Sequence, residues 1–282
     1  MSYHRPDTLA RAIKVLAATN ARILAGGTDI FPAERRQTLT GEILDLTGIA
    51  DLRGIRQTPD GWRIGATTTW SDIANASLPA GFAALQEAAR VVGAQQVQNA
   101  GTIGGNLCNA SPAADGIPPL LVLEGEVEIA ASNGTRRMAL AQFVQGVRKV
   151  DLRPGEILKA VHIAAANVHG ASAFEKLGAR TYLVISITMV AARVVVSDGK
   201  ISAAAISVGA ASPVARRLSG LEEGLIGRDI NDLSAWRGSI RAHIATVLSP
   251  LKDIRGDEAY RLSAAEILIS RAVNRALQGA VV

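Results

Sequence analysis

The chain has 282 residues, of which 48% are hydrophobic and 20% charged, and its formal net charge is +5. This length accommodates two or three compact domains, each with its own hydrophobic core. The basic residues are scattered and only 4% of residues are aromatic, which argues against nucleic-acid binding. No apolar run approaches membrane-spanning length, and the N-terminus lacks the apolar segment of a signal peptide. We therefore expect a cytoplasmic protein with no membrane span.

Cys108 is the single cysteine of the sequence. One thiol excludes an internal disulfide, and it is too few for an iron–sulfur cluster or a cysteine-based zinc site within this chain. No second cysteine or nearby histidine favours thiolate chemistry, so we expect Cys108 to act as a small packing residue. The histidines lack metal-ligand spacing and no hydrolytic triad is recognisable. We expect neither a metal site nor a catalytic residue.

The first 92 residues show alternating helical and strand patterns. Asp7 is the predicted N-cap of a helix whose residues Leu9, Ile13 and Leu16 recur on one face. Pro59-Asp60-Gly61 is typical of a hairpin turn. The further elements expected here are a strand at 22–25, a polar helical stretch at 33–37, a strand at 42–46, strands on either side of the hairpin turn at 55–64, and a helix at 85–92.

Strand patterns are more frequent in the middle of the chain, and helical patterns at its end. Pro118 and Pro119 favour the start of a helix. The other expected elements are strands at 127–130, 136–139 and 157–163, a linker at 165–171, strands at 183–196 and 201–209 joined by a hairpin turn, and two amphipathic C-terminal helices. We expect an α+β nucleotide-binding region to about residue 170, followed by a smaller domain of sheet and helices.

The segment Leu24-Ala25-Gly26-Gly27-Thr28-Asp29-Ile30 sets two glycines beside a hydroxyl. Glycine lets the backbone approach phosphate oxygens closely and tolerates the positive φ that turns successive N–H groups to one side. An ordinary strand-to-helix turn is an equally simple interpretation, because paired glycines are common in turns. The segment lacks the third glycine of a Rossmann fingerprint and the lysine of a P-loop.

A second segment, Thr102-Ile103-Gly104-Gly105-Asn106-Leu107-Cys108-Asn109-Ala110-Ser111-Pro112, is richer in polar groups. Its hydroxyl, amide and glycine groups favour contacts with phosphate and sugar oxygens, and the carboxylate of Asp115 can accept hydrogen bonds from vicinal hydroxyls. A structural turn rich in Asn and Gly is the alternative. A loop of this length without a function would be unusual inside a compact domain.

Lys176 and Arg180 begin the second predicted domain, in the sequence Phe174-Glu175-Lys176-Leu177-Gly178-Ala179-Arg180. A cation here would oppose negative charge on a reduced cofactor ring. The alternative is a surface pair that solvates the edge of a strand.

Together these segments make the chain resemble the FAD-binding medium subunit of the molybdenum hydroxylases, the xanthine dehydrogenase and carbon monoxide dehydrogenase family. Residues 25–29 resemble the first pyrophosphate loop of that family, and residues 99–106 with 110–115 resemble the second. The segments 153–158, 174–180 and 208–210 fall where the family places related segments. The resemblance covers essentially the whole chain.

The resemblance implies an α+β fold with a two-part FAD-binding domain of the vanillyl-alcohol-oxidase-like (PCMH) type at 1–170, divided at about residue 54. It implies a C-terminal domain of the carbon monoxide dehydrogenase flavoprotein type at 171–282, with a small antiparallel sheet and helices. The two glycine-bearing segments would hold the pyrophosphate, Asp115 a ribityl or ribose hydroxyl, and Ile103 with Leu107 would pack against the flavin rings. The cofactor-binding residues so implied are Leu24, Ala25, Gly26, Gly27, Thr28, Asp29, Ile30, Thr102, Ile103, Gly104, Gly105, Asn106, Asn109, Asp115, Leu158 and Lys176.

The resemblance also implies partners: a small subunit with [2Fe–2S] clusters and a large subunit with molybdopterin. This chain would carry non-covalent FAD and pass electrons from those clusters to an external acceptor. The lone cysteine disfavours the 4-hydroxybenzoyl-CoA reductase branch, and Gly-Gly-Thr in place of Gly-Gly-His weakens the carbon monoxide dehydrogenase branch. Gln98 stands where many relatives are expected to have a basic residue. Two other functions stay open: a self-sufficient FAD oxidase or dehydrogenase, and a non-catalytic nucleotide-binding assembly protein.

Overall fold

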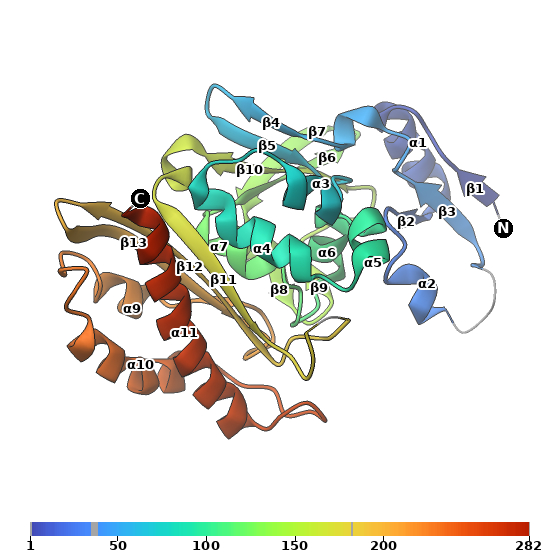
Figure 1. The fold of residues 1–282 in the computed structure, drawn as a ribbon. Coiled ribbons are helices and arrows are strands. Elements are labelled where there is room, and N and C mark those ends of the chain that lie inside the picture. The colour runs from blue at the N-terminus through green and yellow to red at the C-terminus, as the bar shows by residue number, and fades with distance from the viewer. Residues whose placement is uncertain (1, 35–38, 182, 282) are drawn as a thin grey trace.

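The structure of the protein is a computed structural model that describes residues 2–34, 39–181 and 183–281. Within these ranges the strands form four sheets, and helices lie between and outside them (Figure 1). No helix in the described part of the chain is long and apolar enough to cross a membrane. The mixture of helices and antiparallel sheets confirms the α+β class.

The N-terminal part is a three-stranded parallel sheet in the order β1-β3-β2. Its strands are β1 (Ser2–His4), β2 (Arg22–Leu24) and β3 (Glu42–Asp45). Helix α1 (Leu9–Thr19) packs Ala12 and Leu16 against this sheet, which confirms the expected apolar face. The predicted N-cap is wrong by one residue, because the hydroxyl of Thr8 accepts the capping bond from Arg11 N, whereas Asp7 pairs with the Arg11 side chain. The helical stretch expected at 33–37 falls mostly on residues outside the described ranges, after the short helix α2 (Ile30–Ala33).

A five-stranded antiparallel sheet in the order β4-β5-β10-β6-β7 forms the centre of the molecule. Its strands are β4 (Ile55–Thr58), β5 (Gly61–Gly65), β6 (Glu126–Ala131), β7 (Gly134–Ala139) and β10 (Ile157–Ala164). All five were expected from the sequence. Ile64, Val127 and Val161 are buried in the core on one face, and their neighbours Arg63, Glu128 and His162 lie on the other.

Short helices cover the apolar face of this sheet (Figure 1). They are α3 (Trp70–Asn75), α4 (Ala83–Val91), α5 (Gln95–Ala100), α6 (Ile103–Asn109), α7 (Ile117–Val122) and α8 (Leu140–Phe143). A small hairpin, β8 (Val144–Gly146) with β9 (Lys149–Val150), follows α8. Helix α6 corrects the sequence analysis, since most of the second glycine-bearing segment is helical and not an open loop.

The C-terminal part is a four-stranded antiparallel sheet, as expected. Its strands are β11 (Ala171–Leu177), β12 (Thr188–Ser197), β13 (Lys200–Gly209) and β14 (Arg216–Arg217). Helices α10 (Ser234–Val247) and α11 (Glu258–Ala280) cover one face, after the short α9 (Ser219–Glu223). The strand expected from residue 183 begins only at Thr188, because residues 183–187 form a loop.

The other face of the C-terminal sheet packs on α4 and α7, so this sheet is buried on both sides. Phe174, Met189 and Ala191 share a small core there with residues of those two helices. Glu87 of α4 accepts a hydrogen bond from Phe174 N at 2.7 Å and pairs with Arg275 of α11 at 2.5 Å. The helix α4 therefore fixes the position of the C-terminal sheet relative to the central one.

Candidate FAD-binding site

One cavity of about 760 Å³ is lined by both glycine-bearing segments, although they lie some 75 residues apart in the chain. Sites for small molecules and cofactors are typically cavities of about 300–1,000 Å³. Its walls come from the parallel N-terminal sheet, from the helical layer over the central sheet and from the loop between β11 and β12. The folding of the chain thus brings the two segments to a single site.

The first segment follows β2 directly, and each of its two glycines is required for a different structural reason. Gly27 has a φ of +72°, a conformation that side chains with a Cβ rarely adopt. A Cβ on Gly26 would lie 2.0 Å from the carbonyl oxygen of Ala100, so the close approach of the two segments requires glycine there. Within the described residues, the backbone N–H groups of Gly26, Gly27 and Thr28 donate to no acceptor. These amides are available to an anionic ligand.

The second segment differs, because the backbone amides at the start of α6 are already paired. Ile103 N donates to Thr68 O at 3.0 Å, and Gly104 N donates to Ala66 O at 2.8 Å. Gly105 N donates to the hydroxyl of Thr102, which caps helix α6. These three amides are therefore not free to donate to a ligand. The side chains of α6 remain as its means of contacting a ligand.

Asn106 supplies one such side chain. Its Oδ1 atom is fully buried and has no hydrogen-bond partner among the described residues, and the residue lines the cavity. A buried polar atom without a partner costs about 1–3 kcal/mol, so such atoms are usually explained by a ligand or an ordered water. Together with the free amides of the first segment, this unpaired oxygen fits a polar, nucleotide-like group such as FAD.

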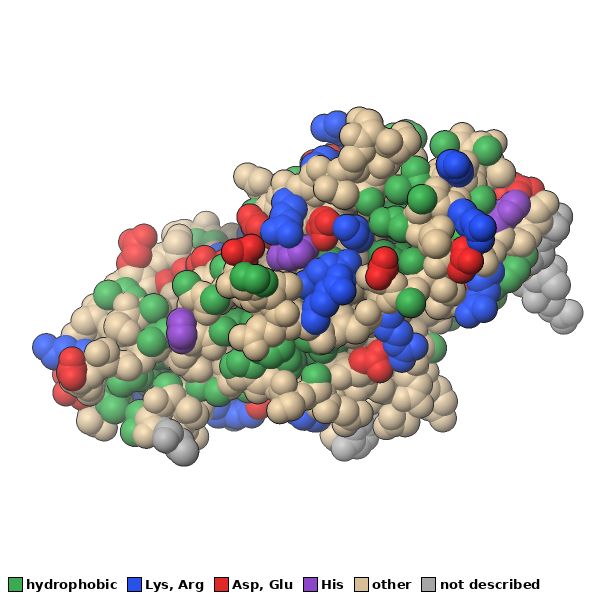
Figure 2. Space-filling model, turned by 90° about the horizontal axis from the view of Figure 1, so that it is seen from above, with side chains coloured by type: hydrophobic (Ala, Val, Ile, Leu, Met, Phe, Trp, Pro, Cys, Tyr) green, Lys and Arg blue, Asp and Glu red, His purple; other side chains and the backbone are tan. Residues whose placement is uncertain are grey.

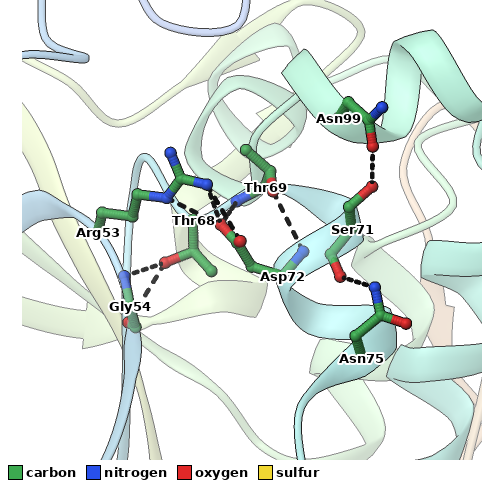
Figure 3. Close-up of polar contacts among 8 residues, drawn as sticks. All are labelled: Arg53, Gly54, Thr68, Thr69, Ser71, Asp72, Asn75 and Asn99. Atoms are coloured by element: carbon green, nitrogen blue, oxygen red, sulfur yellow. Dashed lines mark hydrogen bonds and ion pairs between the residues drawn. The ribbon is translucent and has the colours of Figure 1, made fainter.

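A network of side chains fixes the turn that supports α6 (Figure 3). Thr69 and Asp72 form a reciprocal capping box at the start of α3, and Arg53 binds the Asp72 carboxylate through two hydrogen bonds of 3.0 Å. Ser71 donates to Asn99 at 2.6 Å, which ties α3 to α5. The turn can therefore hold the carbonyls of residues 66 and 68 where α6 needs them.

Asp115, in the turn between α6 and α7, forms a buried ion pair with Lys176 of β11. Its Oδ2 accepts a hydrogen bond from Lys176 Nζ at 2.7 Å, and its Oδ1 accepts one from Ser186 Oγ at 2.5 Å. Burial raises the pKa of the Asp115 carboxyl, and the Lys176 ammonium and Ser186 hydroxyl oppose that rise. Lys176 is therefore a buried residue and not part of a surface pair. Sequence reasoning missed Ser186, which has no local motif.

Arg148 is a second residue that sequence reasoning missed. It is the one lysine or arginine among the described residues that line the cavity. Its guanidinium donates to Asn109 Oδ1 and lies 4.0 Å from Asp29 Oδ1, and Asn109 Nδ2 donates to Asp29 at 2.8 Å. These three residues join the first segment, the end of α6 and the β8–β9 turn. Arg148 places a guanidinium at the cavity wall, where it is paired with the Asp29 carboxylate.

Most of the sequence-predicted binding residues line the cavity, but Leu24, Ile103 and Lys176 do not. Ile103 and Leu107 have no exposed surface and pack in the central core, so their side chains do not reach the cavity to contact flavin rings. Leu158 of β10 does line the cavity. The predicted binding residues that line it are Ala25, Gly26, Gly27, Thr28, Asp29, Ile30, Thr102, Gly104, Gly105, Asn106, Asn109, Asp115 and Leu158.

Cys108 also lines the cavity but is chemically unreactive there, since burial raises the pKa of its thiol to about 12. The apolar wall includes Leu183 and Ile185 of the β11–β12 loop, which are 56% and 52% exposed. Within the described ranges, no group of three or more His, Cys, Asp or Glu residues is arranged to hold a metal ion.

Comparison with known proteins identifies the family of the chain. Residues 1–165 match the family described as the FAD binding domain in molybdopterin dehydrogenase, and residues 172–276 match the CO dehydrogenase flavoprotein C-terminal domain. The chain is 32% identical to the xanthine dehydrogenase FAD-binding subunit of Escherichia coli O157:H7, covering 99% of this chain and 97% of the relative. It is 31% identical to the carbon monoxide dehydrogenase medium chain of Afipia carboxidovorans, covering 97% and 96%.

A solved structure shares the whole architecture. Reconstituted CO dehydrogenase from Oligotropha carboxidovorans superposes with a TM-score of 0.92 at 28% identity, covering 99% of this chain and 98% of that chain. Both domain types, in the same order, are thus present along the full length. The chain belongs to the family of FAD-binding subunits of the molybdenum hydroxylases, the oxidoreductases related to xanthine dehydrogenase and carbon monoxide dehydrogenase.

Proposed function

We propose that this cavity holds FAD and that the chain carries electrons through it within a molybdenum hydroxylase complex. The observation that carries the proposal is the convergence of the two glycine-bearing segments on one cavity with free amides and an unpaired Asn106 oxygen. When bound, FAD supplies a centre that accepts and releases one or two electrons. The protein binds and orients it and shields it from water.

The residues have distinct tasks in this proposal. The free amides of Gly26, Gly27 and Thr28 donate to the diphosphate, and Arg148 balances its charge. Asn106 donates or accepts at the polar part of the cofactor. Leu158 and Ile185 provide apolar contacts for its rings. In this role the residues that line the cavity bind and orient the cofactor, and the substrate reacts in another subunit.

The partners follow from the same family membership. We infer a small [2Fe–2S] subunit that delivers electrons and a large molybdopterin subunit where the substrate reacts with water. The complex works in the cytoplasm. The FAD-binding domain spans 1–170, in two parts divided near residue 54, and the C-terminal domain spans 171–282.

Purification of the tagged chain under native conditions tests the proposal. The expected result is a yellow protein with flavin absorption bands, accompanied by an iron–sulfur subunit and a molybdenum subunit. A colourless protein that takes up no added FAD would overturn the cofactor assignment and favour an assembly factor. Turnover of an electron donor by the isolated chain would favour the self-sufficient oxidase or dehydrogenase.

A further inference from the structure

A second cavity, of about 520 Å³, lies on the opposite face of the central sheet from the proposed FAD site. Leu158 and Lys159 are consecutive residues of β10. Leu158 lines the first cavity and Lys159 lines the second, so the two cavities lie on opposite faces of this strand. Figure 2 views this face and shows basic, acidic and histidine side chains gathered in its middle. The charged residues lining it are Arg56, Asp60, Arg63, Glu126, Glu128, Arg137, Lys159 and His162.

Glu128 is the one acid buried in this cavity wall, and both its oxygens are already bonded. Its Oε1 accepts from Lys159 Nζ at 2.8 Å, and its Oε2 lies 2.8 Å from His162 Nε2. A β-bulge between Leu158 and Ala160 brings Lys159 and His162 to the same face although they are three residues apart. Glu128 therefore has little capacity left for a further cation.

Arg63, at the floor of the cavity, is 5% exposed and poorly satisfied. Its guanidinium is 3.8 Å from Glu128, beyond hydrogen-bond distance, and its one hydrogen bond among the described residues goes to Asp51 O at 3.3 Å. A guanidinium carries five N–H donors. A buried arginine with one long hydrogen bond leaves donors free for a ligand in the cavity.

The neighbours of Arg63 add positive charge. Arg56 is its direct cross-strand partner on β4, and cations directly opposite one another destabilise a sheet. Arg56 and Arg137 have no ion-pair or hydrogen-bond partner within the described part of the chain. Asp60 and Glu126, the two other acids, are exposed, as are Arg56 and Arg137, so solvent weakens all four of these charges, whereas Arg63 is buried. An anion in the cavity would relieve this repulsion.

We propose that this face of the central sheet binds the phosphate group of a small phosphorylated molecule, held by Arg63 with Arg56 and attracted by Arg137. Guanidinium groups bind phosphate through paired, charge-assisted hydrogen bonds, and the oxygens of a phosphate can be reached from several strands at once. The cavity volume leaves space for an organic group beyond the phosphate.

Calorimetric titration of the purified protein with inorganic phosphate at low ionic strength tests the proposal. FAD is added to saturation beforehand, and an absorption spectrum reports that site separately, so that failure at one site is distinguishable from failure at the other. We expect one saturable site. Arg56→Gln should weaken binding by roughly fivefold or more, and Arg56→Gln with Arg137→Gln by more than about tenfold.

Arg271→Gln is the matched control, because Arg271 is an exposed arginine of α11 far from this cavity in the chain and not among its lining residues. Its phosphate affinity should stay within about twofold of the unaltered protein. Absence of saturable binding, or an equal loss in the control, would overturn the proposal. A hexaglutamate peptide that binds these residues more tightly than phosphate would also overturn it, and would indicate a partner protein with an acidic surface.

Discussion

Lys176 Nζ lies 2.7 Å from Asp115 Oδ2, and this pair joins the C-terminal sheet to the wall of the cofactor cavity. Both side chains are more than nine-tenths buried, so each charge depends on the other for its stability. Ser186 binds the second oxygen of the same carboxylate from the β11–β12 loop. A single carboxylate thus holds three segments of the chain together.

We expect Asp115→Asn to destabilise the protein by about 3–5 kcal/mol, because it leaves the Lys176 ammonium buried without its counter-charge. Adding Lys176→Met should recover much of that loss, since an apolar side chain of similar length needs no partner. Urea unfolding, monitored by circular dichroism, measures the free energy of unfolding of Asp115→Asn, Lys176→Met and the double variant. If the double variant loses the sum of the two single losses, the pair makes no coupled contribution.

The sequence predicted the strands of the central sheet, because the alternation of apolar and polar residues is a local signal. It also singled out the two glycine-bearing segments, because paired glycines are visible locally. It did not predict that residues 103–109 form a helix whose amides are already bonded. Those bonds go to Ala66 and Thr68, which precede α6 by more than thirty residues and share no local pattern with it. The amides of residues 103–105 are therefore not free to donate to a ligand.

The same reason explains the residues that sequence analysis missed. Arg148 meets Asn109 across 39 residues, and Lys176 meets Asp115 across 61. Lys176 was singled out from its own segment as a cation near a cofactor, but its pairing with Asp115 was not predicted, and the interval around Arg148 has no motif at all. Contacts of this range depend on how the sheets stack, and the periodicity of a single segment does not contain that information.

The paired glycines of α6 should respond differently to substitution. A Cβ on Gly105 would meet only Thr102 Oγ1, at 3.0 Å, whereas a Cβ on Gly104 would lie 2.6 Å from Ala66 O. We expect Gly105→Val to keep the fold and to weaken FAD binding by more than about tenfold, because its side chain occupies the cavity wall. Gly104→Val should lower the melting temperature of the FAD-free protein instead. Flavin fluorescence titration measures the FAD affinity of each variant, and thermal unfolding measures its melting temperature. Unchanged FAD affinity of Gly105→Val would contradict the site assignment.

Arg148 should contribute to FAD affinity through charge. We expect Arg148→Gln to weaken FAD binding by roughly tenfold, since a hydrogen bond to a charged group contributes about 1.5–3 kcal/mol. The loss should shrink at high salt, where the charge of the diphosphate is screened. Lys149→Gln is the control, because Lys149 is exposed and does not line the cavity. Equal losses in the two variants would show that only the net charge of the protein matters.

The acid stability of the protein should depend on Glu128. Burial favours the neutral carboxyl, but hydrogen bonds from Lys159 and His162 outweigh it and lower the pKa of Glu128 from 4.5 to about 2. An acid with a lowered pKa stabilises the folded state above its unfolded pKa, and that stability is lost as the pH falls from about 4.5 towards about 2. Glu128→Gln should therefore lower the free energy of unfolding at pH 7 and flatten its decline in this acidic range, measured by urea unfolding at a series of pH values.

Glu126→Gln is the control, because Glu126 is exposed on the same strand, and it should leave the dependence of stability on pH unchanged. If the stability of Glu128→Gln declines with acid as steeply as that of the unaltered protein, the Glu128 carboxylate does not carry the acid transition.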